Sequence, residues 1–118
     1  MKNFPTAKDV LPRGEKAVVV FTRGEKLGFD DEGYGGTGNW KTTLAKLEQV
    51  EKVIIYLREK GQSGGQIYVG NYVGYAPSPE ADRVIIYFFH LKEVGSTTSN
   101  WPDFGSFGQN PVGFLGEF

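Results

Sequence analysis

The chain has 118 residues, of which 39% are hydrophobic and 23% are charged, and its net charge is −1. This composition fits one soluble globular domain over 1–118, and it argues against a disordered chain and against nucleic-acid binding through a large basic field. With 17 glycines and 14% aromatic residues, the chain favours a β-rich fold with tight corners over a helical bundle.

Cysteine is absent, and no apolar run is long enough to span a membrane. The lack of cysteine excludes disulfides, thiolate catalysis and cysteine zinc sites, and it is compatible with a reducing compartment. The first residues also lack the apolar core of a signal peptide. We therefore expect a cytoplasmic protein with no membrane partner.

Runs of β-branched and aromatic residues predict strands, and stretches rich in glycine or proline separate them. Leu44 and Leu47 should face the sheet from a short helix. The three strands between 50 and 92 follow one another through short loops, which predicts an antiparallel meander. In chain order we expect a strand over 15–23, a glycine-rich mobile loop over 24–38, a helix within 39–49, strands over 50–58, 66–75 and 83–92, and a short strand over 111–115.

The segment 93–118 contains no Lys or Arg, yet it carries many aromatic rings. Glycine, proline and hydrogen-bonding side chains interrupt 95–105, so we expect neither a regular helix nor a regular strand there. The dipeptide Asn-Trp occurs at 39–40 and again at 100–101. Two indoles from neighbouring loops would face each other across a pocket and hold a flat ligand between them. The alternative is that the rings plug the end of a small β-barrel.

Three patterns that could carry chemistry lack the required context. The glycines of 33–38 match the letters of a dinucleotide-binding fingerprint, but no strand leads directly into them. The acidic run 30–32 lacks the alternating pattern of a calcium loop. His90, the only histidine, has no cysteine partner for zinc, and we interpret it as structural. We therefore expect no catalytic residue, no metal and no cofactor, and a protein that is not an enzyme.

Most of the basic residues lie in the first half of the chain. Residues 1–60 hold eleven of the 13 basic residues, against nine acidic ones. Any edge that faces phosphate should therefore lie in this half. The candidates for phosphate contacts are Arg13, Arg23, Lys26 and Lys41.

Taken in order, four segments resemble the PUA-like superfamily, particularly its EVE, YTH and ASCH branches. The segments are 11–21, similar to the entry strand of EVE domains, 65–74, similar to their glycine-containing central strand, 83–91 and 107–114. The resemblance covers 10–115 and implies an α+β, β-rich fold: a small antiparallel β-barrel with one or two short helices. Such domains bind modified or flipped nucleobases, and they occur at the N-termini of McrBC-type and HNH restriction enzymes.

The resemblance implies a reader module that recognises a modified or flipped base in an aromatic pocket, with DNA as the expected partner in preference to RNA. A nuclease or NTPase domain of a restriction system is a further expected partner. Aromatic stacking would offset the loss of base stacking in the duplex. The alternative is a non-catalytic module that docks a partner protein through its aromatic loops. The expected base-pocket residues are Trp40, Trp101, Asn39, Asn100, Phe104 and Gln109.

Overall fold

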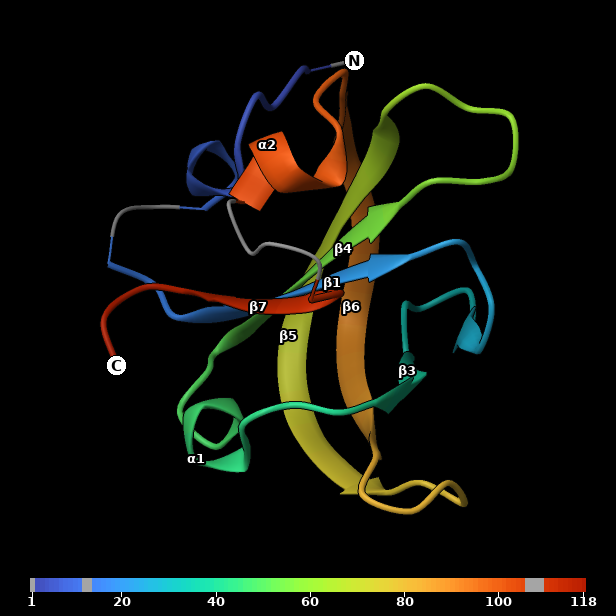
Figure 1. Cartoon of the computed structure of the whole chain (residues 1–118), viewed down its shortest axis with the longest axis vertical. Helices are drawn as coiled ribbons and strands as arrows, with labels where there is room; N and C mark the ends of the chain where they lie inside the picture. The colour runs from blue at the N-terminus through green and yellow to red at the C-terminus, as the bar shows by residue number, and fades with distance from the viewer. Residues whose placement is uncertain (1, 12–13, 106–109) are drawn as a thin grey trace.

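The computed structural model describes residues 2–11, 14–105 and 110–118. These residues form one seven-stranded sheet in the order β2-β3-β6-β5-β4-β1-β7, together with short helices (Figure 1). The elements are η1 (Ala7–Asp9), β1 (Ala17–Thr22), β2 (Leu27–Phe29), β3 (Gly35–Trp40), α1 (Leu44–Leu47), β4 (Lys52–Leu57), β5 (Gly65–Pro77), β6 (Val84–Thr97), α2 (Trp101–Gly105) and β7 (Val112–Leu115).

The predicted meander is confirmed. Strands β4, β5 and β6 are consecutive in the sheet and antiparallel, with Ile54 opposite Val69 and Tyr72 opposite Phe88. The sheet is not wholly antiparallel, however, because β1 pairs with β4 in parallel. A parallel pair requires a long connection between its strands. Here β2, β3 and α1 provide that connection.

Strands β5 and β6 are long and strongly curved (Figure 1). Their register shifts at three places, and such bulges bend a strand and increase its twist. Gly70 lies at one of these shifts, where an added Cβ would meet the Leu91 side chain at 3.1 Å. Across the described residues no strand pairing joins β2 to β7, so the sheet keeps two free edges. The closed barrel that we expected is therefore not confirmed.

Two hydrophobic clusters fill the two faces of the curved sheet, because alternate side chains of a strand point to opposite faces. The N-terminal segment and α2 cover one face, which we call the outer face, and the cluster on the opposite face is the inner cluster. The inner cluster includes Val18, Val20, Leu47, Ile55, Ile86 and Phe88. The outer cluster includes Phe4, Ala17, Val19, Ile54, Tyr56, Trp101 and Phe104.

Helix α1 is a single turn, and only its second leucine is in the core. Leu47 is fully buried in the inner cluster, whereas the Leu44 side chain is 43% exposed. The expectation that both leucines face the sheet is therefore wrong for Leu44, because this turn buries only its C-terminal end. No described helix combines the length and the apolar character needed to cross a bilayer.

The segment expected to be a mobile loop, 24–38, is instead largely a β-hairpin formed by β2 and the start of β3. Its glycines permit close packing between strands. A Cβ added at Gly35 would overlap the backbone of Gly28, and one added at Gly36 would lie 3.0 Å from the Tyr87 ring. Glycine supplies this close approach as readily as it supplies a turn, and the sequence pattern alone does not distinguish the two.

The segment 95–105 is also more regular than expected. Strand β6 continues to Thr97, and α2 begins at Trp101. The polar residue before α2 caps the helix, because the Asn100 side-chain oxygen accepts a hydrogen bond from the Asp103 N–H at 3.2 Å. Gly95 allows the Phe4 ring to approach β6, since an added Cβ would lie 2.7 Å from that ring. The residues that suggested irregular structure therefore serve as a cap and as a packing site.

We expect Phe104→Ala to lower the free energy of unfolding by about 3 kcal/mol, because the ring is 1% exposed and its removal leaves a cavity beneath α2. The matched control is Leu44→Ala, whose side chain is 43% exposed and whose effect should stay within about 1 kcal/mol. Urea denaturation measures both values. Equal losses for the two variants would contradict the assignment of α2 to the core.

Candidate functional site

The two tryptophans lie on opposite faces of the sheet. The Trp101 side chain is 7% exposed and belongs to the outer cluster, whereas Trp40 is half-buried against the inner cluster. The two indoles therefore do not face each other across a pocket. The reason is that Trp40 belongs to β3, a strand of the sheet, and packs against the inner cluster, whereas Trp101 belongs to α2, which covers the outer face. The shared Asn-Trp dipeptide does not reveal this difference.

Trp101 and Phe104 are buried, but they pack on the outer face of an open sheet and do not plug the end of a barrel. The Trp101 ring centroid lies 5.5 Å from that of Phe21 and 5.7 Å from that of Tyr56. Its indole N–H donates a hydrogen bond to the backbone oxygen of Asn110 at 2.9 Å. This bond links α2 to the start of β7, so the indole contributes to the packing of the C-terminal segment.

Of the other residues expected at the site, Asn100 is an exposed helix cap beside Trp101. Lys41 follows β3 and is exposed. Arg13 and Gln109 lie outside the described residues.

A cleft of about 330 Å³ beside Trp40 brings four of the expected residues together. Asn39 and Trp40 come from the end of β3, whereas Arg23 and Lys26 come from the connection between β1 and β2. The volume lies near the lower end of the ~300–1,000 Å³ typical of small-ligand sites. Its lining residues are Phe21, Thr22, Arg23, Glu25, Lys26, Gly38, Asn39, Trp40 and Glu80.

Hydrogen bonds fix the aromatic ring and the amide that border this cleft. The Trp40 indole N–H donates to the hydroxyl oxygen of Thr37 at 3.0 Å, and Thr37 is itself fully buried. The Asn39 side-chain oxygen accepts a hydrogen bond from the Ser78 hydroxyl. The Asn39 backbone oxygen accepts from the Arg83 guanidinium at 3.1 Å. The cleft is therefore bordered by groups whose positions are set by their neighbours.

A second groove, of about 790 Å³, begins on the other side of Trp40. It runs between residues 110–114 and the segment that leads from β3 into α1. All its charged lining residues are basic: Lys41, Lys46 and Arg83. The Lys46 ammonium lies 5.7 Å from the Phe114 ring centroid.

Arg83 was missed among the expected phosphate contacts because it is distant in sequence from the basic first half. It reaches the site because β6 pairs with β3, with Val84 opposite Trp40. The sequence gives no signal for that pairing.

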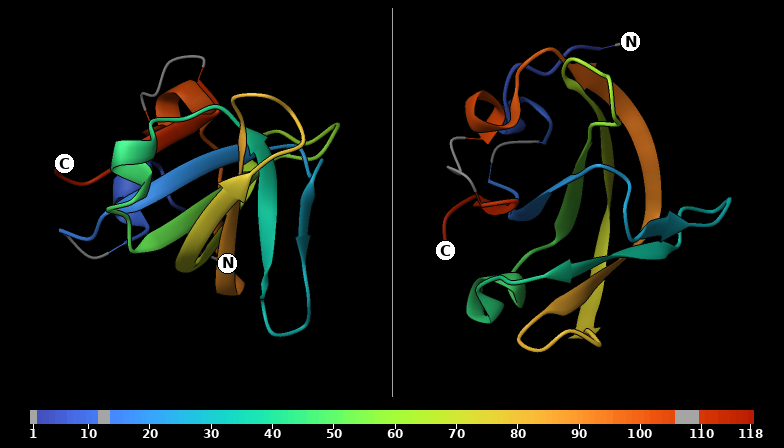
Figure 2. Two further views of the ribbon diagram at one scale, coloured as in Figure 1. Left: turned by 90° about the horizontal axis from the view of Figure 1, so that it is seen from below. Right: turned by 45° about the vertical axis from the view of Figure 1, so that its right-hand side comes forward.

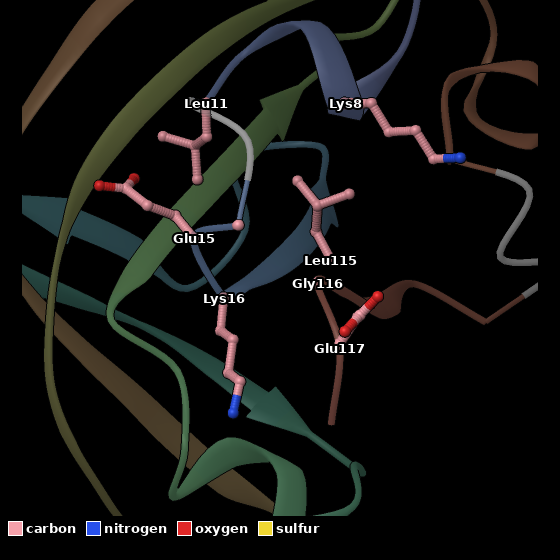
Figure 3. A pocket seen from close by; sticks show the side chains of 8 residues that line it. Lys8, Leu11, Glu15, Lys16, Leu115, Gly116 and Glu117 are labelled. Atoms are coloured by element: carbon pink, nitrogen blue, oxygen red, sulfur yellow. The ribbon is translucent and has the colours of Figure 1, made fainter.

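Another hollow, of about 990 Å³, lies between the N-terminal segment and the end of β7. Figure 3 shows its charged side chains, Lys8, Glu15, Lys16 and Glu117, spread around Leu11 and Leu115. Among the described residues no aromatic ring lines it, and its charges are mixed in sign. It offers a flat ligand no ring to stack on, so we assign the candidate site to the two hollows beside Trp40.

Comparison of the chain with family models, with curated proteins and with solved structures finds no match. Within 2–11, 14–105 and 110–118, no cluster of three or more histidine or acidic side chains could hold a metal ion. The chemistry of the site therefore has to be inferred from the ring, the amide and the cations that border it.

The buried phenol beneath Trp101 predicts how stability depends on pH. Burial raises the pKa of Tyr56 above its ordinary value of 10.0, against a smaller opposing effect of Arg58. The folded protein therefore keeps this proton at a pH where the unfolded chain releases it. The resulting stability is complete below pH 10.0 and is lost as the pH rises through the raised pKa.

We expect Tyr56→Phe to lower the free energy of unfolding by about 1 kcal/mol at neutral pH, because the phenol donates a 2.6 Å hydrogen bond to the Ser99 backbone oxygen. The variant should also lose less stability than the wild type between pH 9 and 11, since it lacks the titrating group. Urea titrations across this range measure both effects. Tyr34→Phe is the control at neutral pH, where its 54% exposed ring predicts almost no change. An unchanged alkaline slope for Tyr56→Phe would contradict the prediction.

Proposed function

We propose that this chain is a nucleic-acid-binding module of the PUA-like kind, in which an unstacked base lies against the indole of Trp40. The cleft beside Trp40 supports the proposal, because one hollow combines an aromatic ring, the amide of Asn39 and the cations Arg23 and Lys26. A flat apolar surface, a polar edge and positive charge are what a base and its phosphate require.

The energy of stacking constrains which base such a site can take. One aromatic face contributes ~1–3 kcal/mol to the binding of a base, whereas extrusion from a duplex costs a few kcal/mol. With Trp101 buried on the other face, a single indole does not by itself offset extrusion. The site therefore favours a base that is already weakly paired, such as a modified, mismatched or single-stranded one, for which this cost is smallest.

The basic groove beyond Trp40 provides a path for the sugar–phosphate backbone. Lys41, Lys46 and Arg83 line it without an acidic neighbour in the lining, whereas the cleft itself contains Glu25 and Glu80. Phosphates would lie in the groove and the base in the cleft, with Trp40 at the boundary. Such an arrangement concentrates positive charge locally, which suits a chain whose net charge is −1.

The partner in this proposal is DNA that carries a modified base, and the chain performs no catalysis on it. A linked nuclease or NTPase domain of a restriction system would act after recognition. Phe21 also lines the cleft, and an apolar neighbour of this kind could accommodate a base methyl group. Burial of one methyl group is worth of order 1 kcal/mol, which is enough for a several-fold preference.

Trp40→Ala should weaken the binding of short oligonucleotides by about ten- to a hundredfold, because it removes the stacking surface. Fluorescence titration of the wild type should show quenching of the half-buried Trp40, with the buried Trp101 as an internal reference. Trp40→Phe is the matched control, since it keeps a ring and should retain most of the affinity. Modified and unmodified DNA and RNA are compared in parallel. Unchanged affinity in a folded Trp40→Ala variant would refute the proposal.

Lys41→Gln should reduce the slope of log affinity against log salt concentration by about 0.7–0.9, the effect of losing one phosphate contact. Lys41 lines the groove, whereas the exposed Lys60 does not. Lys60→Gln is therefore the control, because it removes the same charge at a position outside the groove. Titrations at several salt concentrations measure both slopes. If the two variants change the slope equally, the groove is not the phosphate path.

A further inference from the structure

Part of the outer sheet face is apolar and uncovered. The N-terminal segment and α2 cover the outer face around β1 and β4, but the region around β3 and the first half of β6 carries no covering element in the described chain. Three large side chains there are well exposed: Tyr34 at 54%, Val73 at 52% and Tyr87 at 40%. We call these three residues, together with Phe89, the outer patch.

The backbone register places the Tyr87 ring of the outer patch over a glycine. Tyr87 lies opposite Gly36 of β3, and an added Cβ at that glycine would sit 3.0 Å from the Tyr87 ring. The ring therefore packs against bare backbone with its other side exposed to solvent. Tyr34 continues the surface, with its ring centroid 5.8 Å from that of Phe89. An exposed apolar sheet face of this kind is suited to packing against a second sheet.

A row of side chains crosses the outer patch from β4 to the β2–β3 hairpin, perpendicular to the strands. Its two ends are charged. At the β4 end, the Lys52 ammonium is held by a 2.6 Å hydrogen bond to the side-chain oxygen of Asn71, which lies opposite Phe89. At the β3 end, the turn of the β2–β3 hairpin carries the acidic run 30–32. Figure 2 shows this hairpin extending beyond the body of the sheet. The row is therefore basic at one end and acidic at the other.

We propose that the outer patch binds a second copy of this chain, sheet face to sheet face. A twofold axis that runs along β6 between the two copies places Lys52 of each copy over the acidic hairpin turn of the other. The same operation stacks Tyr87 and Phe89 on their counterparts, so one symmetric contact satisfies the apolar centre and both charged ends. The Trp40 clefts remain outside this contact, so the dimer would carry two nucleic-acid sites.

The acidic turn favours a second copy over a nucleic acid on this face. Exposed tyrosines on a sheet also resemble a stacking platform for bases. A polyanion that followed the row from Lys52, however, would meet Asp30, Asp31 and Glu32 at its other end. The self-complementary arrangement uses both charges, whereas the polyanion is repelled by one of them.

Sedimentation velocity over micromolar to millimolar concentrations of the full chain tests the proposal. The wild type should pass from monomer to dimer, and Tyr87→Asp should raise the dissociation constant by at least about tenfold, because it places a charge at the apolar centre. Leu44→Asp is the matched control: its side chain is 43% exposed on α1, away from the outer patch, and dimerisation should be unchanged. Circular dichroism confirms that each variant is folded.

A charge exchange tests the twofold arrangement. Lys52→Glu should weaken the dimer about two- to fivefold, and adding Asp31→Lys to it should restore most of the loss. Asp31 is chosen because Asp30 accepts two backbone hydrogen bonds within the turn. A wild type that stays monomeric throughout, or a Tyr87→Asp variant that dimerises as well as Leu44→Asp, would overturn the proposal. Loss of single-stranded oligonucleotide binding in Tyr87→Asp, without any dimer in the wild type, would assign the face to nucleic acid instead.

Discussion

Strand β1 is buried on both faces, and its parallel pairing with β4 organises the rest of the molecule. Its alternate side chains supply both clusters: Val18 and Val20 the inner one, Ala17 and Val19 the outer one. Because the two strands are parallel, the chain must return across the fold between them. That return contains the β2–β3 hairpin and α1, and it carries Trp40 to the cleft that Arg23 borders just after the end of β1.

The aromatic residues therefore differ in their surroundings: some are packed in the core, and one borders the candidate site. Trp101, Phe104 and Tyr56 pack together beneath α2, where a ring contributes stability and is closed to a ligand. Trp40 is held by Thr37 at the boundary of two hollows, where one part of the indole contacts the core and another borders the cleft. An indole held in this way loses little further conformational freedom on binding, which favours its use as a stacking surface.

Strand β7, at one edge of the sheet, also borders the candidate site. Among the described residues β7 pairs with β1 alone, and Val112, Gly113 and Phe114 of β7 line the basic groove. This groove, with Lys41, Lys46 and Arg83, is the path that we propose for the nucleic-acid backbone. The outer patch shares no residue with the lining of the two hollows beside Trp40, so the self-association and the nucleic-acid binding that we propose use different residues.

The sequence by itself determined the central meander, the short strand at 112–115 and the β-rich class, because alternating apolar residues specify a strand locally. It also placed Asn39, Trp40, Arg23 and Lys26 among the candidates that the cleft unites. Only the tertiary structure decided that 24–38 contains a hairpin, that the two tryptophans occupy opposite faces and that Arg83 reaches Asn39 from 44 positions away. Each of these depends on which strands pair across the fold. Pairing is a non-local interaction that glycine spacing or a shared dipeptide does not encode.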